Sequence, residues 1–200
     1  MKIFKNLSIA VIVFISANCF SQSFMGDIVN RLHFGVKAGV NYSDFTNASF
    51  NTEGLTGFQA GVILGFRISD KFSIEEEFLY SQQGATLKGS LSSDKKIKLS
   101  YFAVPILLRY KMPVGLFFEA GPQVGILVDE DVKALSVGDD DFAKKIDAGA
   151  VGGIGYVFKS GFGINARYFQ SFTDLSKKSA AFFNPNFQNN SVQFGLFYNF

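Results

Sequence analysis

The stretch SVQFGLFYNF, residues 191–200, decides the fold class of this chain. Its even-numbered positions are Val, Phe, Leu, Tyr and Phe, whereas the positions between them are mostly small or polar. Successive side chains of a β-strand point to opposite faces, so this alternation predicts a strand with one apolar face and one polar face. Such an aromatic ending is typical of a bacterial outer-membrane β-barrel, whose last strand pairs with its first and turns its aromatic residues to lipid.

The same alternation recurs in seven earlier segments. The expected strands are 33–42, 57–68, 72–82, 97–111, 116–127, 146–158, 161–172 and 191–200. Tight turns at 69–71, 112–115 and 159–161 alternate with long polar links at 43–56, 83–96, 128–145 and 173–190. Short connections on one rim and long ones on the other are typical of transmembrane barrels. The sequence therefore predicts an all-β, eight-stranded antiparallel up-and-down transmembrane β-barrel with short periplasmic turns and long extracellular loops.

Two residues depart from the alternation. Pro105 lacks a backbone N–H in the middle of the strand expected at 97–111, which predicts a local bulge there. Glu76 falls on the apolar face of the strand expected at 72–82, and the pattern offers no reason for it.

Residues 1–21 have the layout of a secretory signal peptide, with two lysines, an apolar run over 7–15 and a small or polar region. We expect cleavage between Ser21 and Gln22. The alternative, lipidation of Cys19, requires a small residue where Asn18 stands. The chain is therefore expected to leave the cytoplasm for the bacterial outer membrane.

The rest of the chain is expected to form a periplasmic lead-in at 22–32, which shows no clear period, and a barrel domain at 33–200. The chain is 48% hydrophobic, with 25 Phe and 20 Gly. Beyond the signal peptide, no run approaches the roughly 18 apolar residues that a membrane helix needs. The apolar residues are dispersed, as alternating strands require.

A soluble lipid carrier is also an antiparallel barrel, so the residues on each face must separate the two classes. The polar face is rich in glycine and charge, which suits the narrow interior of an eight-stranded barrel. We expect paired charges there: Lys37, Arg67, Glu77, Arg109, Glu119 and Arg167. On the apolar face we expect a lipid-facing aromatic girdle: Tyr42, Tyr80, Tyr110, Tyr156, Tyr168, Tyr198 and Phe200. This distribution favours the membrane barrel.

The sequence offers little for catalysis, and we expect no enzyme and no cofactor. His33 is the only histidine and lies at the periplasmic start of the first strand, where an interfacial or turn role is expected. The acidic runs 129–131 and 138–141 are either a calcium-binding loop or a solvated one, and the solvated loop is favoured because their spacing matches no EF-hand. The formal charge of +2 is too small to suggest nucleic acid.

The expected partners are those of an outer-membrane barrel. They are lipid and glycolipid, the barrel-assembly machinery through the C-terminal strand, and another envelope protein. Lys95, Lys96, Lys177 and Lys178 lie in long links. These lysines either meet glycolipid phosphates or are simply solvated.

The segment YFAVPILLRY, residues 101–110, resembles the fourth-strand signature of the PorT-like outer-membrane β-barrels of Bacteroidetes. Further blocks that look like the family occur at 34–41, 80–84, 119–122 and 147–156, and at Arg167-Tyr168 followed by Thr173-Asp174. Ala103 stands where the family usually has Glu, and Ser171 where it usually has Gly, so the interior charges must differ near the fourth strand. The resemblance implies an outer-membrane location and an eight-stranded barrel. It implies no single activity, although one branch of the family takes part in protein secretion.

Three functions follow as expectations. The first is a non-enzymatic barrel that acts through its surface loops, in envelope structure, adhesion or partner contact. The second is a PorT-like accessory protein of a secretion system, acting through its periplasmic turns. The third is a narrow transport pore, which eight strands disfavour because side chains fill so small a barrel.

Overall fold

The computed structural model describes residues 22–46, 52–87, 95–131, 145–174 and 188–200. The chain divides into two compact units, Met1–Leu32 and His33–Phe200. In the first unit the described residues form one α-helix, α2 (Gln22–Arg31), where the sequence pattern predicted no regular element. No helix among the described residues is both long and apolar enough to cross a membrane. The expected signal peptide at 1–21 lies outside the described residues.

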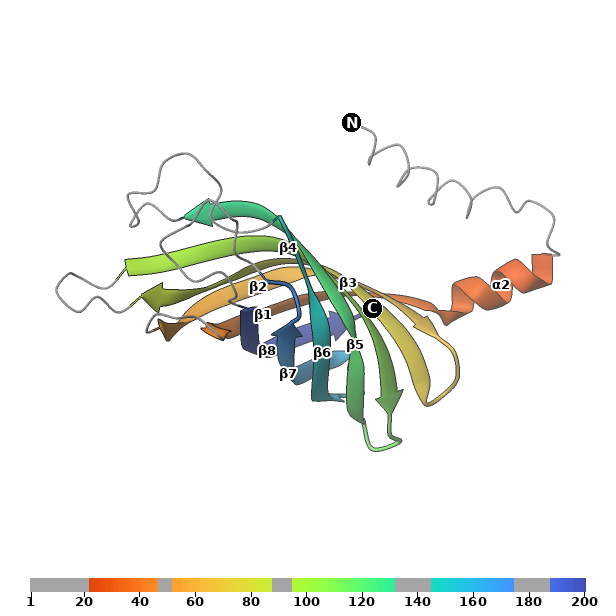
Figure 1. The fold of residues 1–200 in the computed structure, drawn as a ribbon. Helices are drawn as coiled ribbons and strands as arrows, with labels where there is room; N and C mark the ends of the chain where they lie inside the picture. Colours follow the sequence, from red (N-terminus) through yellow and green to blue (C-terminus); the bar gives the residue numbers. More distant parts are fainter. Residues whose placement is uncertain (1–21, 47–51, 88–94, 132–144, 175–187) are drawn as a thin grey trace. The chain divides into compact units, whose positions relative to one another are not determined.

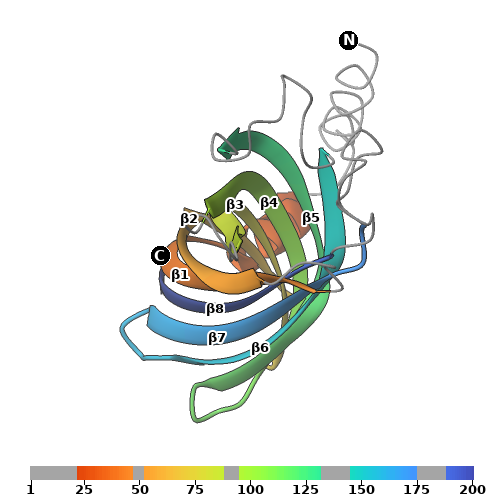
Figure 2. The same ribbon diagram turned by 60° about the vertical axis from the view of Figure 1, so that its left-hand side comes forward.

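The second unit is a closed antiparallel β-barrel of eight strands in sequence order, shown from two directions in Figures 1 and 2. The strands are β1 (Leu32–Thr46), β2 (Thr52–Arg67), β3 (Phe72–Leu87), β4 (Lys95–Lys111), β5 (Leu116–Asp131), β6 (Ile146–Val157), β7 (Phe162–Ser171) and β8 (Gln188–Asn199). The predicted fold class is confirmed: each strand pairs with its sequence neighbour, and β1 pairs with β8.

The closing seam joins the two ends of the barrel domain. β1 and β8 pair in one continuous register from Gly35 opposite Asn199 to Thr46 opposite Gln188. The backbone N–H of Phe200 donates to the carbonyl of Phe34 at 2.8 Å and extends this pairing to the last residue. The terminal aromatic stretch therefore completes the barrel.

Three short turns connect β2 to β3, β4 to β5 and β6 to β7. Gly115 and Gly161 have φ angles of 97° and 87°, values that glycine adopts without a steric penalty. Their N–H groups donate to the carbonyls of Met112 and Phe158 at 3.0 and 3.1 Å, which closes each turn. These turns and the start of β1 lie at the same rim of the barrel, called here the short-turn rim.

Several strands are longer than predicted at the opposite rim. β1 continues to Thr46 instead of residue 42, and β3 continues to Leu87 instead of residue 82. Much of the link expected at 43–56 therefore belongs to β1 and β2. The hydrophobic alternation stops at the edge of the band of outward-facing apolar residues, called here the belt. The hydrogen-bonded pairing of the strands continues beyond this belt. The sequence pattern therefore marks the belt and not the full strand.

The bulge predicted at Pro105 is wrong. Pro105 lies opposite Gln123 in an unshifted stretch of the β4–β5 register, and the register shift occurs between Ser100 and Tyr101. On its other side the β3–β4 pairing is interrupted near Pro105 but resumes in the same register. The missing donor removes ladder contacts without inserting an extra residue.

Candidate functional site

The centre of the barrel holds a cluster of charged side chains, called here the ion-pair network: Lys37, Glu75, Glu77, Arg109, Glu119 and Arg167. Strand alternation points all six inward, from β1, β3, β4, β5 and β7, and each is at most 5% exposed. The six carry three positive and three negative charges. A balanced set is needed because an unpaired charge that is so deeply buried is very costly.

Arg167 lies at the centre of the network. Its Nη1 and Nη2 donate to the two carboxylate oxygens of Glu77, each at 2.7 Å, and its Nε donates to Glu119 at 2.5 Å. Lys37 donates to Glu77 at 3.2 Å from the first strand. Arg167 thus bridges two carboxylates with the planar, forked geometry that only arginine offers.

A second arginine links this centre to the short-turn rim. Arg109 donates to Glu119 at 3.1 and 2.9 Å and lies 3.4 Å from Glu75. Its guanidinium carbon is 4.2 Å from the ring centroid of Phe117, a cation–π distance. Glu75 in turn contacts His33 at 3.0 Å. The polar contacts therefore run from the middle of the barrel to His33.

Two apolar clusters lie beside the ion-pair network, one toward each rim of the barrel. Ile63, Phe117 and Phe197 pack together toward the short-turn rim, and Leu107, Val151 and Phe169 pack together toward the other rim; all six are at most 3% exposed. Glycines make room for these rings: a Cβ on Gly163 would lie 2.2 Å from the Phe197 ring. The interior is therefore packed with side chains on both sides of the charges.

The structure places most of the predicted interior charges together and separates one from them. Lys37, Glu77, Arg109, Glu119 and Arg167 all lie in the ion-pair network. Arg67 does not: it is the last residue of β2, and its side chain is exposed at the short-turn rim. The prediction for Arg67 relied on strand parity alone, which gives the face of the strand but not the depth in the barrel.

Three polar residues of this region were missed as members of the site. Glu75 follows the inward parity of Glu77, so the alternation contained that signal. Asn165 donates to Glu119 at 3.0 Å, again from an inward position. His33 was expected at an interface or turn, and nothing in its local sequence indicates the contact with Glu75 across 42 residues.

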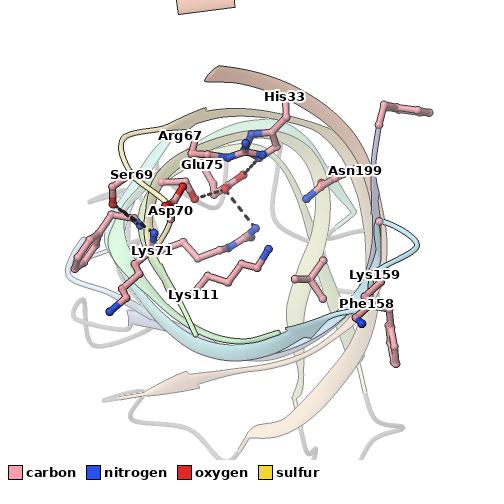
Figure 3. Close-up of a pocket in the computed structure, with 16 residues that line it drawn as sticks. His33, Arg67, Ser69, Asp70, Lys71, Glu75, Lys111, Phe158, Lys159 and Asn199 are labelled. Carbon is pink, nitrogen blue, oxygen red and sulfur yellow. Dashed lines mark hydrogen bonds and ion pairs between the residues drawn. The ribbon is translucent and has the colours of Figure 1, made fainter. Parts of the chain in front are cut away.

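A pocket of about 480 Å³ opens at the short-turn rim and is called here the mouth pocket. Figure 3 shows His33, Arg67, Glu75 and Lys111 projecting into the ring of strands. The Lys and Arg side chains that line it are Arg67, Lys71, Arg109, Lys111 and Lys159, against the two acids Asp70 and Glu75. Five basic side chains against two acidic ones give the pocket a net positive charge. Arg109 and His33 already contact one of the two acids, Glu75.

The predicted girdle residues lie on the outward face of the strands. Tyr42, Tyr80, Tyr156, Tyr168, Tyr198 and Phe200 are exposed, and Tyr110 is half-buried. Near the short-turn rim, Phe72 packs on Tyr110 with ring centroids 5.1 Å apart. Farther along, Phe58 packs on Tyr80 at 5.7 Å. The outward face therefore carries aromatic contacts at these two levels.

The remaining candidate residues form no site in the described chain. Residues 129–131 end β5, and Lys96 is exposed near the start of β4. The run 138–141, Lys177 and Lys178 lie outside the described residues. Within the described ranges, no group of three or more His, Cys, Asp or Glu side chains could hold a metal ion.

Comparisons with known proteins agree with this architecture. A family model described as "Outer membrane protein beta-barrel domain" matches residues 20–177. The crystal structure of Neisserial surface protein A is 16% identical and superposes with a TM-score of 0.57, over 84% of this chain and 97% of that one. The outer membrane protein OprG from Pseudomonas aeruginosa is 17% identical, with a TM-score of 0.51 over 84% and 95%. At these identities the likeness concerns the fold alone. No curated protein matches the chain.

Proposed function

Because the chain belongs to the outer membrane protein beta-barrel domain family, we propose that it is a closed, non-enzymatic scaffold that acts by contact through its extracellular loops. The protein lies in the bacterial outer membrane, with its short turns toward the periplasm. The contacts that we propose are with outer-leaflet glycolipid and with another envelope protein. During assembly, β8 is the segment offered to the barrel-assembly machinery.

The packed interior is the observation that carries this proposal. Two apolar clusters whose members are at most 3% exposed fill the interior beside the ion-pair network, one toward each rim. A transport function would need a hydrated path past the Phe117 and Phe169 levels and past six mutually engaged charges. Side chains that fill an eight-stranded barrel leave the rims and the outer wall as its working surfaces.

We expect the purified mature protein to give no unitary conductance steps in a planar lipid bilayer. The physical reason is the packed cross-section at the Phe117 and Phe169 levels. A general porin added to the same bilayer is the positive control, and a cold gel confirms that the inserted protein is folded. Reproducible single-channel steps from the folded protein would favour the narrow pore and overturn the scaffold.

The loop contacts are tested in intact cells. Replacing residues 175–187 by a glycine–serine linker of the same length should abolish capture of the envelope partner while the folded band on a cold gel persists. The same replacement of residues 132–144 maps the contact to one loop or the other. Capture that survives both replacements would remove the loops as the working surface.

A periplasmic accessory role in secretion, as in the PorT-like branch, is the second candidate, and the mouth pocket favours it. Arg67, Lys71, Lys111 and Lys159 are exposed cations on the side where a secretion partner would dock. Such a cluster attracts an acidic segment of a partner by charge.

We expect the double variant Arg67→Gln/Lys111→Gln to lose surface-exported proteins from the secretome if this role holds, because two of the four exposed cations of the mouth pocket are neutralised. Lys96→Gln, an exposed lysine near the other rim, is the matched control. A normal secretome in the double variant would remove the accessory role and leave the loop scaffold.

A further inference from the structure

Glu76 faces away from the barrel interior. Its neighbours in β3, Glu75 and Glu77, are buried in the ion-pair network, so alternation places Glu76 on the outward face. Leu64 of β2 and Ile106 of β4 lie directly opposite it in the register. The wall around this carboxyl group is therefore apolar.

The position of Glu76 along β3 puts it deep in the lipid belt. It lies midway between Phe72 and Tyr80, whose rings mark the two aromatic levels on this part of the wall. Glu76 is four positions from each, which is about 13 Å along a strand. A glutamate side chain is too short to reach water from that depth, unlike the long stems of Lys and Arg.

No group of the described chain compensates this carboxyl group. The hydrogen bonds and ion pairs of the described residues include none from the Glu76 side chain, although they engage Glu75 and Glu77 fully. The outward residues of the described strands between the two aromatic levels include no Lys or Arg. An ionisable group inside a membrane is costly and marks a functional contact by default.

We propose that the β3 wall around Glu76 is the contact surface of a homodimer, in which two Glu76 carboxyl groups hydrogen-bond to each other. Two copies inserted in the same orientation are related by a two-fold axis along the membrane normal. Such an axis keeps every residue at its own depth, so Glu76 meets Glu76 whatever that depth is. Leu64, Ile106 and Phe78 surround the pair and pack against their counterparts.

The chemistry of the carboxyl group favours a second copy. In hydrocarbon the neutral acid is far less costly than the carboxylate. A neutral acid donates one hydrogen bond and accepts another, so two of them satisfy each other across the axis. A basic partner would also satisfy Glu76, but the described strands offer no outward cation within the belt. A pair of Glu76 carboxyl groups from two copies needs only groups that this protein itself supplies.

Energy transfer in lipid vesicles tests the homodimer with the full mature chain. Dyes are attached through Ser160→Cys in the short β6–β7 turn, away from the β3 wall. We expect transfer above the random-encounter level for the unaltered wall, and Glu76→Leu should raise the dimer dissociation constant about tenfold by removing both hydrogen bonds. Glu76→Gln should retain the dimer, because its amide both donates and accepts.

Charge reversal and a matched glutamate control complete the test. Glu76→Lys should be monomeric alone and should pair with the unaltered protein through an ion pair. Glu53→Leu, at an exposed glutamate outside the belt, should leave dimerisation unchanged. Glu76→Leu is expected to remain folded because a leucine suits the lipid-facing wall, and the shift of the folded band on a cold gel verifies this.

Three outcomes would overturn the proposal. The unaltered protein could show only random transfer at every protein-to-lipid ratio. Glu76→Leu could dimerise as well as the unaltered protein. Transfer seen only in the mixture of unaltered protein and Glu76→Lys would indicate that the natural partner is a cationic membrane segment.

Discussion

Arg167→Met should lower the free energy of unfolding by about 3–5 kcal/mol, the usual effect of removing one partner from a buried ion pair. Arg167 makes two hydrogen bonds to Glu77 and one to Glu119, so its loss leaves two carboxylates short of positive charge. The chain has no Trp, so unfolding in urea is followed by circular dichroism and by the folded band on a cold gel.

Two comparisons isolate the cause. Arg67→Met makes the same chemical change at the exposed arginine of the short-turn rim and should shift the unfolding midpoint little. The double variant Arg167→Met/Glu77→Gln restores the charge balance and should recover part of the loss. Equal effects of Arg167→Met and Arg67→Met would show that the buried network contributes no more than a surface arginine does.

Gly39→Ala should destabilise the closing seam by about 1–3 kcal/mol, the typical cost of overpacking. Gly39 lies opposite Gly195 where β1 meets β8. An added Cβ would lie 2.2 Å from the carbonyl oxygen of Phe194 and 2.9 Å from the Cα of Gly195. Both atoms belong to the backbone of β8, so relief requires the strands to separate. The folded fraction in vesicles and the urea midpoint measure the effect.

Gly152→Ala is the matched control on β6. An added Cβ there has no atom within 4 Å. The substitution should be neutral or stabilise by up to about 1 kcal/mol, because alanine loses less backbone freedom on folding than glycine does. The same unfolding midpoint for both alanine variants would mean that the β1–β8 seam accommodates a methyl group and is looser than its geometry indicates.

The sequence pattern predicts the barrel well because one physical cause produces it. Lipid outside and a narrow interior inside impose a two-residue alternation, so the strand number, the short turns and the inward faces all follow from the residues. The pattern ends where the lipid belt ends, so it could not give the extension of β1 to Thr46 or of β3 to Leu87. The helix α2 has no such alternation to reveal it.

The interior site is only partly visible in the sequence. Alternation identifies which side chains point inward. It gives neither their position around the barrel nor their depth along the barrel axis. Arg67 and Arg109 share the inward parity, yet Arg109 reaches Glu119 whereas Arg67 lies at the rim. The contact between His33 and Glu75 depends on the stagger of the strands around the barrel, which no local pattern records.

The way in which the ion-pair network joins distant strands bears on how the protein enters the membrane. The β4–β5 hairpin carries a matched pair of its own, Arg109 with Glu119. Glu77, in contrast, has Lys37 from β1 as an early partner and gains its bidentate partner Arg167 only 90 residues later in the chain. A sheet of β1 to β6 without β7 would hold three carboxylates of the ion-pair network, Glu75, Glu77 and Glu119, against only two cations, Lys37 and Arg109. Membrane insertion and barrel closure are therefore expected to occur in one cooperative step. Partly inserted intermediates should be sparsely populated, because each of them carries an unpaired negative charge inside the membrane.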